Sequence, residues 1–345
     1  MFVKPQRLKK GDTVAVLSPS AGLPSLFPHI YEEGLKNLQD LGLKIKEFPT
    51  ARADREYLYD NPKARAEDLN KAFEDHEVKG IITSIGGDDS VRILPYLNLE
   101  IIKANPKLFM GYSDTTTMTS YLNQQGLVTF NGPSVMAGFS QLKALPDQFK
   151  RFIETFLFEK NDSYVYLPYG EYHDGYLEWK EVNNVGKVKE AKKATGWDWL
   201  QGTGTVEGEL FGGCIEVLEM MKGTDFWPKK DFWSGKILFL ETSEDKPTVE
   251  MVKYFLRNYG VQGVFARIKG LLFGRARDYT DEEKDQLDKM IVRVVAREFG
   301  QKDLMIVSNI DFGHTDPQII LPLGIKAELN STEKTFKLRE SPFAD

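Results

Sequence analysis

The sequence predicts an α/β protein with two domains, and three observations lead to that prediction. Its 345 residues are more than a single domain usually needs. Between residues 13 and 130, short apolar runs alternate with segments in which apolar residues recur at helical spacing. The same alternation resumes after residue 207. Strands that alternate with helices form a parallel sheet covered by helices, so we expect such a sheet in the first half and a second α/β domain after it.

The elements of the first half follow from the spacing of apolar residues and from the glycines that interrupt it. We expect strands at 13–18, 43–48, 80–87, 107–112 and 126–130, and helices at 27–41, 62–75 and after Ser113. In sheets of this kind, ligands bind at the carboxyl ends of the strands. The Gly86-Gly87 turn and Ser113 both follow such strand ends, which is the first indication of a functional site.

The second half begins after a change of composition. Residues 168–204 are polar, charged and glycine-rich, and we expect an inter-domain connection with a long loop that covers a site. After it we expect glycines that open a helix within 208–223, strands at 235–245, 270–276 and 304–314, and helices at 249–260 and 281–300, the former ending at Gly260. The expected domains are residues 1–165, which carry the nucleophile, a linker and loop at 166–206, and residues 207–345.

Composition excludes several classes of function. The net charge of −6 and the pI near 5.5 argue against a nucleic-acid partner. A single cysteine, Cys214, excludes an intrachain disulfide and nearly excludes a cysteine-ligated zinc, and we expect neither metal nor cofactor. No run of about 18 apolar residues is present, so we expect a cytoplasmic protein without a membrane span. The chain has only four histidines: His29, His76, His173 and His314.

Ser113 is the leading candidate for a catalytic residue. It follows the apolar run 107–112 and precedes a helix, which is the setting of a nucleophile elbow. The backbone N–H of Asp114, directly after it, would then donate to an oxyanion. Ser113 could equally be the N-cap of the helix, because serine is favoured there and the local motif is GYSD rather than GxSxG.

A serine nucleophile needs a base and a carboxylate that orients the base. His314 closes an apolar strand, although the neighbouring glycine and proline would also suit an exposed turn. Glu241 ends the apolar run KILFLE and is the best carboxylate, unless it is a surface acid, while Glu244 and Asp245 after it could be ordinary solvated acids. The three candidates follow one another as Ser, Glu and His, each at the end of an apolar strand.

Other residues complete the expected site. The backbone N–H of Gly87 would be the second oxyanion donor, and Gly86 and Asp88 would line the pocket. Trp197 and Trp199 lie between glycines in a polar segment and could form an exposed stacking surface for substrate. Cys214 lacks a nucleophile elbow, which argues against a cysteine-dependent amidotransferase.

Several motifs together resemble one known family. The stretches GDTVAVLSPS, IGGDDS, FMGYSD, GELFGGCIEVLEMMKGT, ILFLETSED and DFGHTDPQIILPLG occur in the order found in the LD-carboxypeptidase family of serine peptidases (peptidase family S66), which includes the microcin C immunity hydrolases. The resemblance covers about residues 10–330. It implies a flavodoxin-like N-terminal domain, a smaller C-terminal domain and a homodimer. Two features depart from many relatives: Asp88 and Asp89 follow the Gly-Gly turn, and Cys214 replaces an asparagine.

The resemblance also implies roles for the candidate residues. It implies a triad of Ser113, Glu241 and His314, with an oxyanion hole made by the backbone of Gly87 and Asp114. The long loop resembles the microcin-immunity branch, in which a loop aromatic stacks on a nucleobase. We therefore expect hydrolysis of an aminoacyl-nucleotide amide through an acyl-enzyme. The alternatives are removal of the terminal D-Ala from a murein tetrapeptide and a non-catalytic solute-binding protein. An unperturbed His314 would titrate near pH 6.5, about where activity would fall on acidification.

Overall fold

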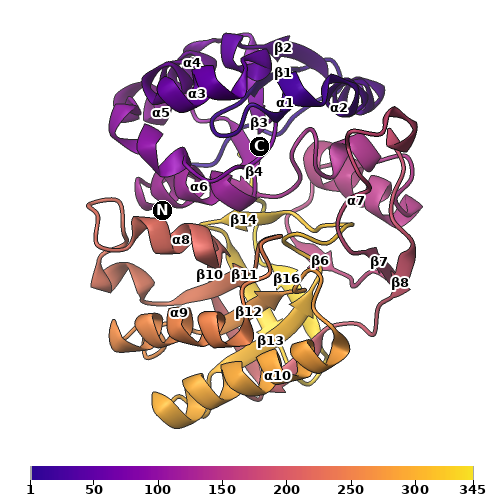
Figure 1. Cartoon of the computed structure of the whole chain (residues 1–345). Helices are drawn as coiled ribbons and strands as arrows, with labels where there is room; N and C mark the ends of the chain where they lie inside the picture. Colours follow the sequence, from indigo (N-terminus) through magenta and orange to yellow (C-terminus); the bar gives the residue numbers. More distant parts are fainter. Residues whose placement is uncertain (1, 345) are drawn as a thin grey trace.

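The computed structural model describes residues 2–344 and confirms the α/β prediction. Two sheets lie one above the other, each flanked by helices, with the first half of the chain in the upper layer of Figure 1. The six-stranded sheet has the order β14-β5-β4-β3-β1-β2, and the eight-stranded sheet has the order β6-β16-β15-β10-β11-β12-β13-β9. A two-stranded sheet, β7-β8, lies at the side of the molecule.

The first sheet is parallel from β2 through β5. Its central strands are almost entirely buried because they are largely apolar, whereas β2 at the edge is only partly covered. The strands are β1 (Thr13–Leu17), β2 (Lys44–Glu47), β3 (Val78–Thr83), β4 (Leu108–Gly111) and β5 (Thr129–Asn131). The α-helices that flank them are α1 (Leu23–Leu26), α2 (Pro28–Asp40), α3 (Arg55–Asp60), α4 (Pro62–Glu74), α5 (Leu99–Ala104), α6 (Thr116–Gln124) and α7 (Asp147–Phe158).

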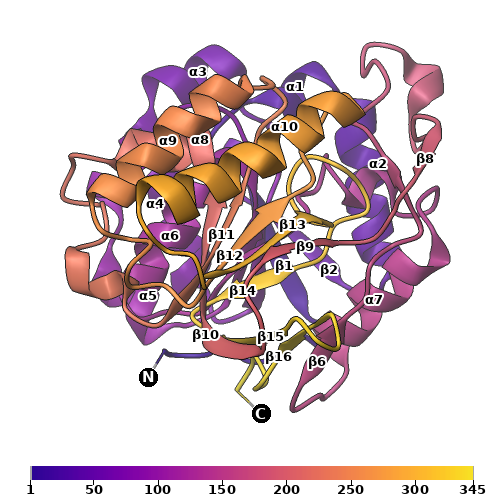
Figure 2. The same ribbon diagram turned by 90° about the horizontal axis from the view of Figure 1, so that it is seen from below.

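The second sheet has a parallel centre, β10 to β13, with antiparallel strands added on both sides. Its strands are β9 (Asp198–Gln201), β10 (Thr205–Cys214), β11 (Lys236–Glu241), β12 (Gly270–Gly274), β13 (Met305–Ile310), β15 (Lys326–Asn330), β16 (Thr335–Leu338) and β6 (Tyr164–Tyr166). Three helices cover one face and lie side by side in Figure 2: α8 (Ile215–Met221), α9 (Val249–Val261) and α10 (Asp281–Val292).

The two sheets exchange strands. β14 (Leu321–Leu323) comes from the C-terminal half, yet it pairs with β5 and so extends the first sheet. β6, from near the end of the first half, pairs with β16 in the second sheet. The chain therefore crosses between the two layers several times.

Two expectations about elements are wrong. Residues 205–214 form β10, and the glycines at 212 and 213 belong to that strand rather than to a helix start. A Cβ on Gly212 would clash with the backbone carbonyl of Phe239 in β11, so the glycine allows the two strands to approach. Helix α9 continues past Gly260, and the glycine with positive φ is Gly263 (φ 74°).

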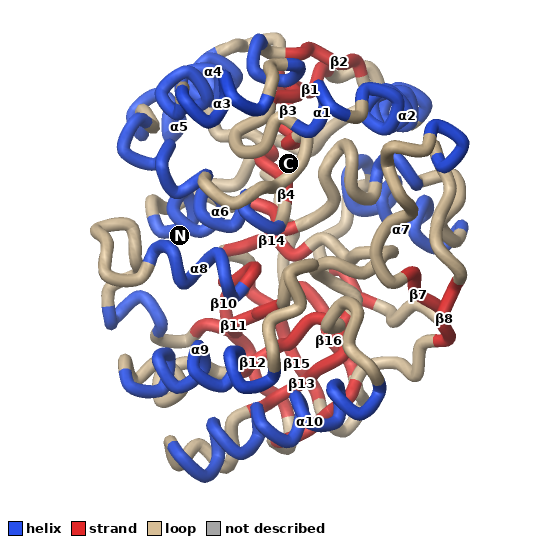
Figure 3. Tube along the Cα trace, viewed as in Figure 1, coloured by secondary structure: helices blue, strands red, loops and turns tan. Residues whose placement is uncertain are grey.

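The polar segment 168–204 is mostly loop, as expected, and follows one side of the molecule (Figure 3). It also contains three short strands: β7 (Glu171–His173), β8 (Ala191–Lys193) and β9. β9 pairs with β13 and is part of the second sheet, which has consequences for the tryptophans discussed below. Within residues 2–344, no helix is long and apolar enough to cross a membrane.

Candidate active site

Ser113 lies in a strained turn between β4 and α6. Its φ of 57° places it in the left-handed region, which is uncommon for a residue with a side chain. Helix α6 starts at Thr116, and Thr115 occupies its N-cap position. Ser113 is therefore not the N-cap of α6, and the geometry is that of a strand-turn-helix elbow.

Two glycines allow the turn to pack closely. A Cβ on Gly86 would lie 2.8 Å from the Cβ of Ser113, and a Cβ on Gly111 would lie 2.9 Å from Thr115 Oγ1. Since contacts under 3 Å do not occur for real Cβ atoms, both positions need glycine. The Gly86-Gly87 turn thus lies directly against the serine.

Glu241 and His314 are joined by a hydrogen bond. The Nδ1 of His314 lies 2.7 Å from Oε2 of Glu241, and both side chains are buried. Glu241 ends β11, and a Cβ on Gly313 would lie 2.6 Å from the same carboxylate oxygen. The ring of Tyr112 meets the imidazole edge-on at a centroid distance of 5.0 Å. This packing fixes the ring with Nδ1 toward the carboxylate.

The other ring nitrogen of His314 faces a second carboxylate. Its Nε2 lies 2.9 Å from Oε2 of Glu244, whose side chain is 53% exposed. Glu244 is thus not an ordinary solvated acid. Burial alone lowers the pKa of His314, but the charges and hydrogen bonds of Glu241 and Glu244 outweigh it and raise the pKa to about 10. In turn, the contact with His314 lowers the pKa of Glu244 to about 2.

Ser113 and His314 line one pocket of about 380 Å³. It opens beside the Gly86-Gly87 turn and has a wall of aromatic side chains together with the charged groups of Glu178, Glu244 and Arg277. The aromatic wall consists of Phe27, Tyr112, Tyr176 and Trp179. The pocket therefore combines a hydroxyl, an imidazole, an apolar platform and charges of both signs.

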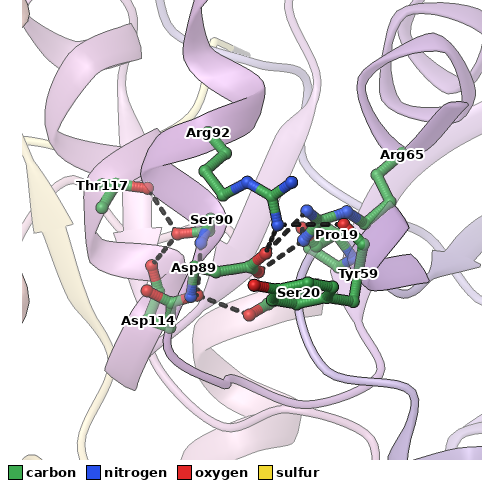
Figure 4. Close-up of polar contacts among 9 residues, drawn as sticks. All are labelled: Pro19, Ser20, Tyr59, Arg65, Asp89, Ser90, Arg92, Asp114 and Thr117. Carbon is green, nitrogen blue, oxygen red and sulfur yellow. Dashed lines mark hydrogen bonds and ion pairs between the residues drawn. The ribbon is translucent and has the colours of Figure 1, made fainter. Parts of the chain in front are cut away.

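The carboxylate of Asp114 holds the Gly-Gly turn in place, as Figure 4 shows. Its Oδ2 accepts the backbone N–H groups of Asp89 and Ser90 at 3.1 and 2.8 Å and the hydroxyl of Ser20 at 2.5 Å. The Ser90 hydroxyl donates to the Asp114 carbonyl at 2.6 Å and lies 2.6 Å from Thr117 Oγ1. The residue after Ser113 is therefore tied to the residues that follow Gly87.

Asp89 anchors the far side of this turn. Its carboxylate accepts two hydrogen bonds from Arg65, at 2.6 and 2.9 Å, and one from Arg92 at 2.8 Å (Figure 4). Arg65 is fully buried and also donates to the carbonyl of Pro19. Bidentate arginine–carboxylate pairs are geometrically specific, so this pair fixes the position of the turn as well as its charge balance.

The structure brings some of the expected binding residues together and separates others. Gly86 and Gly87 line the pocket beside Ser113. Asp88 is exposed to solvent and is not among the residues that line the pocket. Trp197 donates its indole N–H to Asp311 at 2.7 Å, and Trp199 lies in β9, which pairs with β13. Neither tryptophan is among the residues that line the pocket.

The tryptophan in the pocket is Trp179. Its ring meets Phe27 edge-on at 5.7 Å and Tyr176 at 5.5 Å. Its carbonyl lies 2.6 Å from the Nε2 of His29, which ties the loop to α2. In the sequence, Trp179 stands among charged residues in the same polar segment as the other two. Only tertiary contacts distinguish them: Trp199 lies in β9, which pairs with β13, and Trp197 bonds to Asp311.

No metal-binding arrangement is found within residues 2–344, since no three His, Cys, Asp or Glu side chains there are grouped to hold an ion. Cys214 is fully buried at the end of β10, and burial raises the pKa of its thiol well above the usual value. A thiol that stays protonated is a poor nucleophile.

Two family models match the chain. Residues 14–132 match the LD-carboxypeptidase N-terminal domain, and residues 207–329 match the LD-carboxypeptidase C-terminal domain. The first match contains Ser113, and the second contains Glu241 and His314. Together they cover most of the chain, and the unmatched segment between them contains Trp179.

Relatives of known description align over nearly the whole chain. A Bacillus subtilis protein described as a "probable murein peptide carboxypeptidase" is 29% identical over 96% of this chain and 93% of its own length. The microcin C7 self-immunity protein MccF of Escherichia coli is 27% identical over 96% of this chain and 94% of its own. A solved structure of MccF in complex with aspartyl sulfamoyl adenosine has a TM-score of 0.86 and 26% identity and covers 99% of this chain and 100% of that one.

Proposed function

The chain belongs to the LD-carboxypeptidase family, and from that premise we propose that it is a serine hydrolase that cleaves the amide bond between an aminoacyl group and a nucleotide-like partner. The peptidase family and the carboxypeptidase names of its relatives make the chain a hydrolase rather than a solute-binding protein. The observation that carries the finer proposal is the pocket in which Ser113 and His314 lie beside the aromatic wall of Trp179.

The chemistry follows from the positions of the side chains. Ser113 Oγ attacks the amide carbonyl, His314 Nε2 accepts the hydroxyl proton, and Glu241 keeps the imidazole oriented. The N–H groups of Gly87 and Asp114 stabilise the oxyanion, each contributing about 3 kcal/mol. His314 then passes the proton to the leaving nitrogen, and water releases the acyl group from Ser113 by the same steps in reverse order.

Trp179 supports a nucleotide-like leaving group. With Phe27 and Tyr176, whose rings are inclined to it by 71° and 52°, it forms an apolar aromatic wall, and a planar base can stack on the face of one such ring. MccF, the relative solved with aspartyl sulfamoyl adenosine, matches the fold of 99% of this chain. These two observations favour an aminoacyl-nucleotide over a peptide.

One observation favours a second candidate, the murein tetrapeptide. Arg277 lines the same pocket, and a guanidinium there can bind the free carboxylate of a terminal D-Ala. The Bacillus subtilis relative described as a murein peptide carboxypeptidase is equally similar over its length. In this case the aromatic wall would only provide apolar contacts to the peptide and would have no base to stack on.

The experiment that separates the two offers the purified protein an aminoacyl sulfamoyl adenosine and a murein tetrapeptide, and identifies the products by mass. We expect the free amino acid and sulfamoyl adenosine from the first substrate. Release of D-Ala from the tetrapeptide with no reaction of the nucleoside compound would reject the proposal in favour of the second candidate. The control is Ser113→Ala, which should reduce turnover of either substrate by several orders of magnitude.

A further inference from the structure

Glu244 occupies the nitrogen of His314 that the nucleophile needs. A serine hydroxyl can give its proton to an imidazole only when one ring nitrogen is free to accept it. Here Nδ1 bonds to Glu241, and Nε2 lies 2.9 Å from Glu244. Within residues 2–344 the structure records no hydrogen bond between Ser113 and His314. The base is therefore capped on its catalytic side.

The charges around His314 favour its protonated form in this arrangement. Glu241 faces it from the end of β11 and Glu244 from the following loop, and these two contacts raise the pKa of His314 to about 10 against the effect of burial. The buried acid Asp316 lies on the same chain segment, and Tyr112 faces the ring from the end of β4. An imidazolium whose Nδ1–H bonds to Glu241 and whose Nε2 lies 2.9 Å from the Glu244 carboxylate keeps its proton near neutral pH and cannot act as a base.

Glu244 is able to move while its neighbours are fixed. Ser243 is held by two hydrogen bonds to Glu216, at 2.9 Å from its backbone N–H and 2.7 Å from its hydroxyl. Lys246 pairs with Glu283 at 3.0 Å. The backbone of the loop is thus anchored on both sides, and the half-exposed Glu244 side chain can turn about its own bonds toward the pocket.

The pocket offers Glu244 few alternative partners from the chain. Among the described residues that line the pocket, Arg277 is the one arginine or lysine, but it already pairs with Asp278 at 3.2 Å and stacks over Tyr176. Glu178, on the opposite segment of the wall, adds a second negative charge. A cation that enters beside Ser113 would therefore meet two carboxylates and only one guanidinium.

We propose that Glu244 is a removable cap on His314 that is drawn away by a substrate whose acyl group carries a primary ammonium. This inference rests on the proposed function, and it deepens it by naming a required charge on the acyl side of the scissile amide. When the ammonium pairs with Glu244, the contact with Nε2 is lost. The Nε2 proton then passes to solvent, while Nδ1–H stays hydrogen-bonded to Glu241. The imidazole is now neutral, and its Nε2 can accept the proton of Ser113.

The cap makes the reaction selective in a specific way. A substrate with the same acyl group but no positive charge can enter the pocket. Glu244 then keeps its contact with His314, and the imidazole cannot act as a base for Ser113. The charged and uncharged substrates should therefore differ in kcat as well as in KM, because the ammonium both binds to Glu244 and frees His314 to act as a base. A carboxylate that only bound the substrate would affect KM alone.

The experiment compares an aminoacyl sulfamoyl adenosine with its Nα-acetylated form, in the wild-type protein and in Glu244→Gln. We expect the wild type to prefer the free amine by at least about tenfold in kcat/KM. In Glu244→Gln the acetylated compound should react faster and the free amine should bind less well, so that the preference falls toward one. Glu244→Ala should behave in the same way. The matched control is Asp245→Asn, which removes one charge from the next exposed position of the same loop and should keep the wild-type preference.

A second measurement is independent of turnover. In the Ser113→Ala background, the NMR titration of His314 should move to lower pH when Glu244→Gln is added. If Glu244→Gln leaves the His314 titration unchanged, or leaves the preference for the free amine unchanged, the proposal that Glu244 caps His314 is overturned. If the wild type hydrolyses neither nucleoside compound, the proposed function fails, and the titration still decides whether Glu244 caps His314.

Discussion

Asp114 and Ser90 are joined through both side chain and backbone. The carboxylate of Asp114 accepts the N–H of Ser90 at 2.8 Å, and the carbonyl of Asp114 accepts the hydroxyl of Ser90 at 2.6 Å. Asp114 directly follows the candidate nucleophile, while Ser90 lies three residues after Gly87. The double connection fixes the distance between the two backbone segments whose N–H groups we propose as oxyanion donors.

This connection predicts that the side chain of Asp114 is a positioning residue. In Asp114→Ala the N–H groups of Asp89 and Ser90 lose their shared acceptor, and the turn can drift from Ser113. We expect kcat to fall by about 10²–10³, the loss typical of one oxyanion donor, with KM changed little. Affinity for a phosphonate transition-state analogue should fall in parallel with kcat/KM. A variant that lost kcat but bound the analogue as tightly as wild type would contradict this role.

The ion pair between the buried Arg65 and the partly buried Asp89 predicts a large effect on stability. Asp89→Ala leaves the guanidinium of Arg65 buried and without its carboxylate, and breaking such a pair typically costs about 3–5 kcal/mol. Denaturant unfolding should show this as a lower midpoint with an unchanged slope. Asp88→Ala is the matched control, because Asp88 is exposed and its replacement should change stability by less than about 0.5 kcal/mol. Equal effects of the two variants would contradict the importance of the pair.

The sequence predicts the alternation of strands and helices in the first half because apolar runs mark buried parallel strands directly. It fails at β10, where two glycines serve close packing of the strand and imitate the start of a helix. It also misses β14, β15 and β16, which are short antiparallel additions that join the sheets through β5, β10 and β6, all far away in the chain. Local patterns contain no information about such distant pairing.

The same limit applies to the candidate site. Ser113, Glu241 and His314 could be proposed from the sequence because each lies at or just after the carboxyl end of an apolar strand, where α/β sheets bind ligands. That the strand ends come from two different sheets, β4 in the first and β11 and β13 in the second, could not be seen from the sequence. The tryptophan at the pocket could not, because Trp179 and Trp199 stand in equally polar surroundings and differ only in tertiary contacts. The role of Glu244 depends on a rotamer toward His314, which no sequence pattern shows.

The position of Trp179 predicts a selective effect on substrate binding. Trp179→Ala removes the central ring of the aromatic wall, and loss of one base-stacking ring typically costs about 1–3 kcal/mol. We expect KM for an aminoacyl sulfamoyl adenosine to rise by about tenfold or more, with kcat changed little. Trp199→Phe is the control, since that residue lies in β9 outside the pocket. A larger KM effect in Trp199→Phe than in Trp179→Ala would reject the assignment.

The raised pKa of His314 predicts how the free energy of unfolding depends on pH. The folded protein raises the pKa of this imidazole to about 10, above the value of about 6.5 expected in the unfolded chain. Between these two values the folded state binds the extra proton, so its stabilising effect is complete below about pH 6.5 and is lost as the pH rises toward 10. The free energy of unfolding should fall over this range with a slope of at most about 1.4 kcal/mol per pH unit from this group. Denaturant titrations at pH 6 to 10 measure the slope, and His314→Gln should flatten it. If His314→Gln retains the full wild-type slope, other groups cause the pH dependence and the two carboxylates do not hold His314 in its charged form.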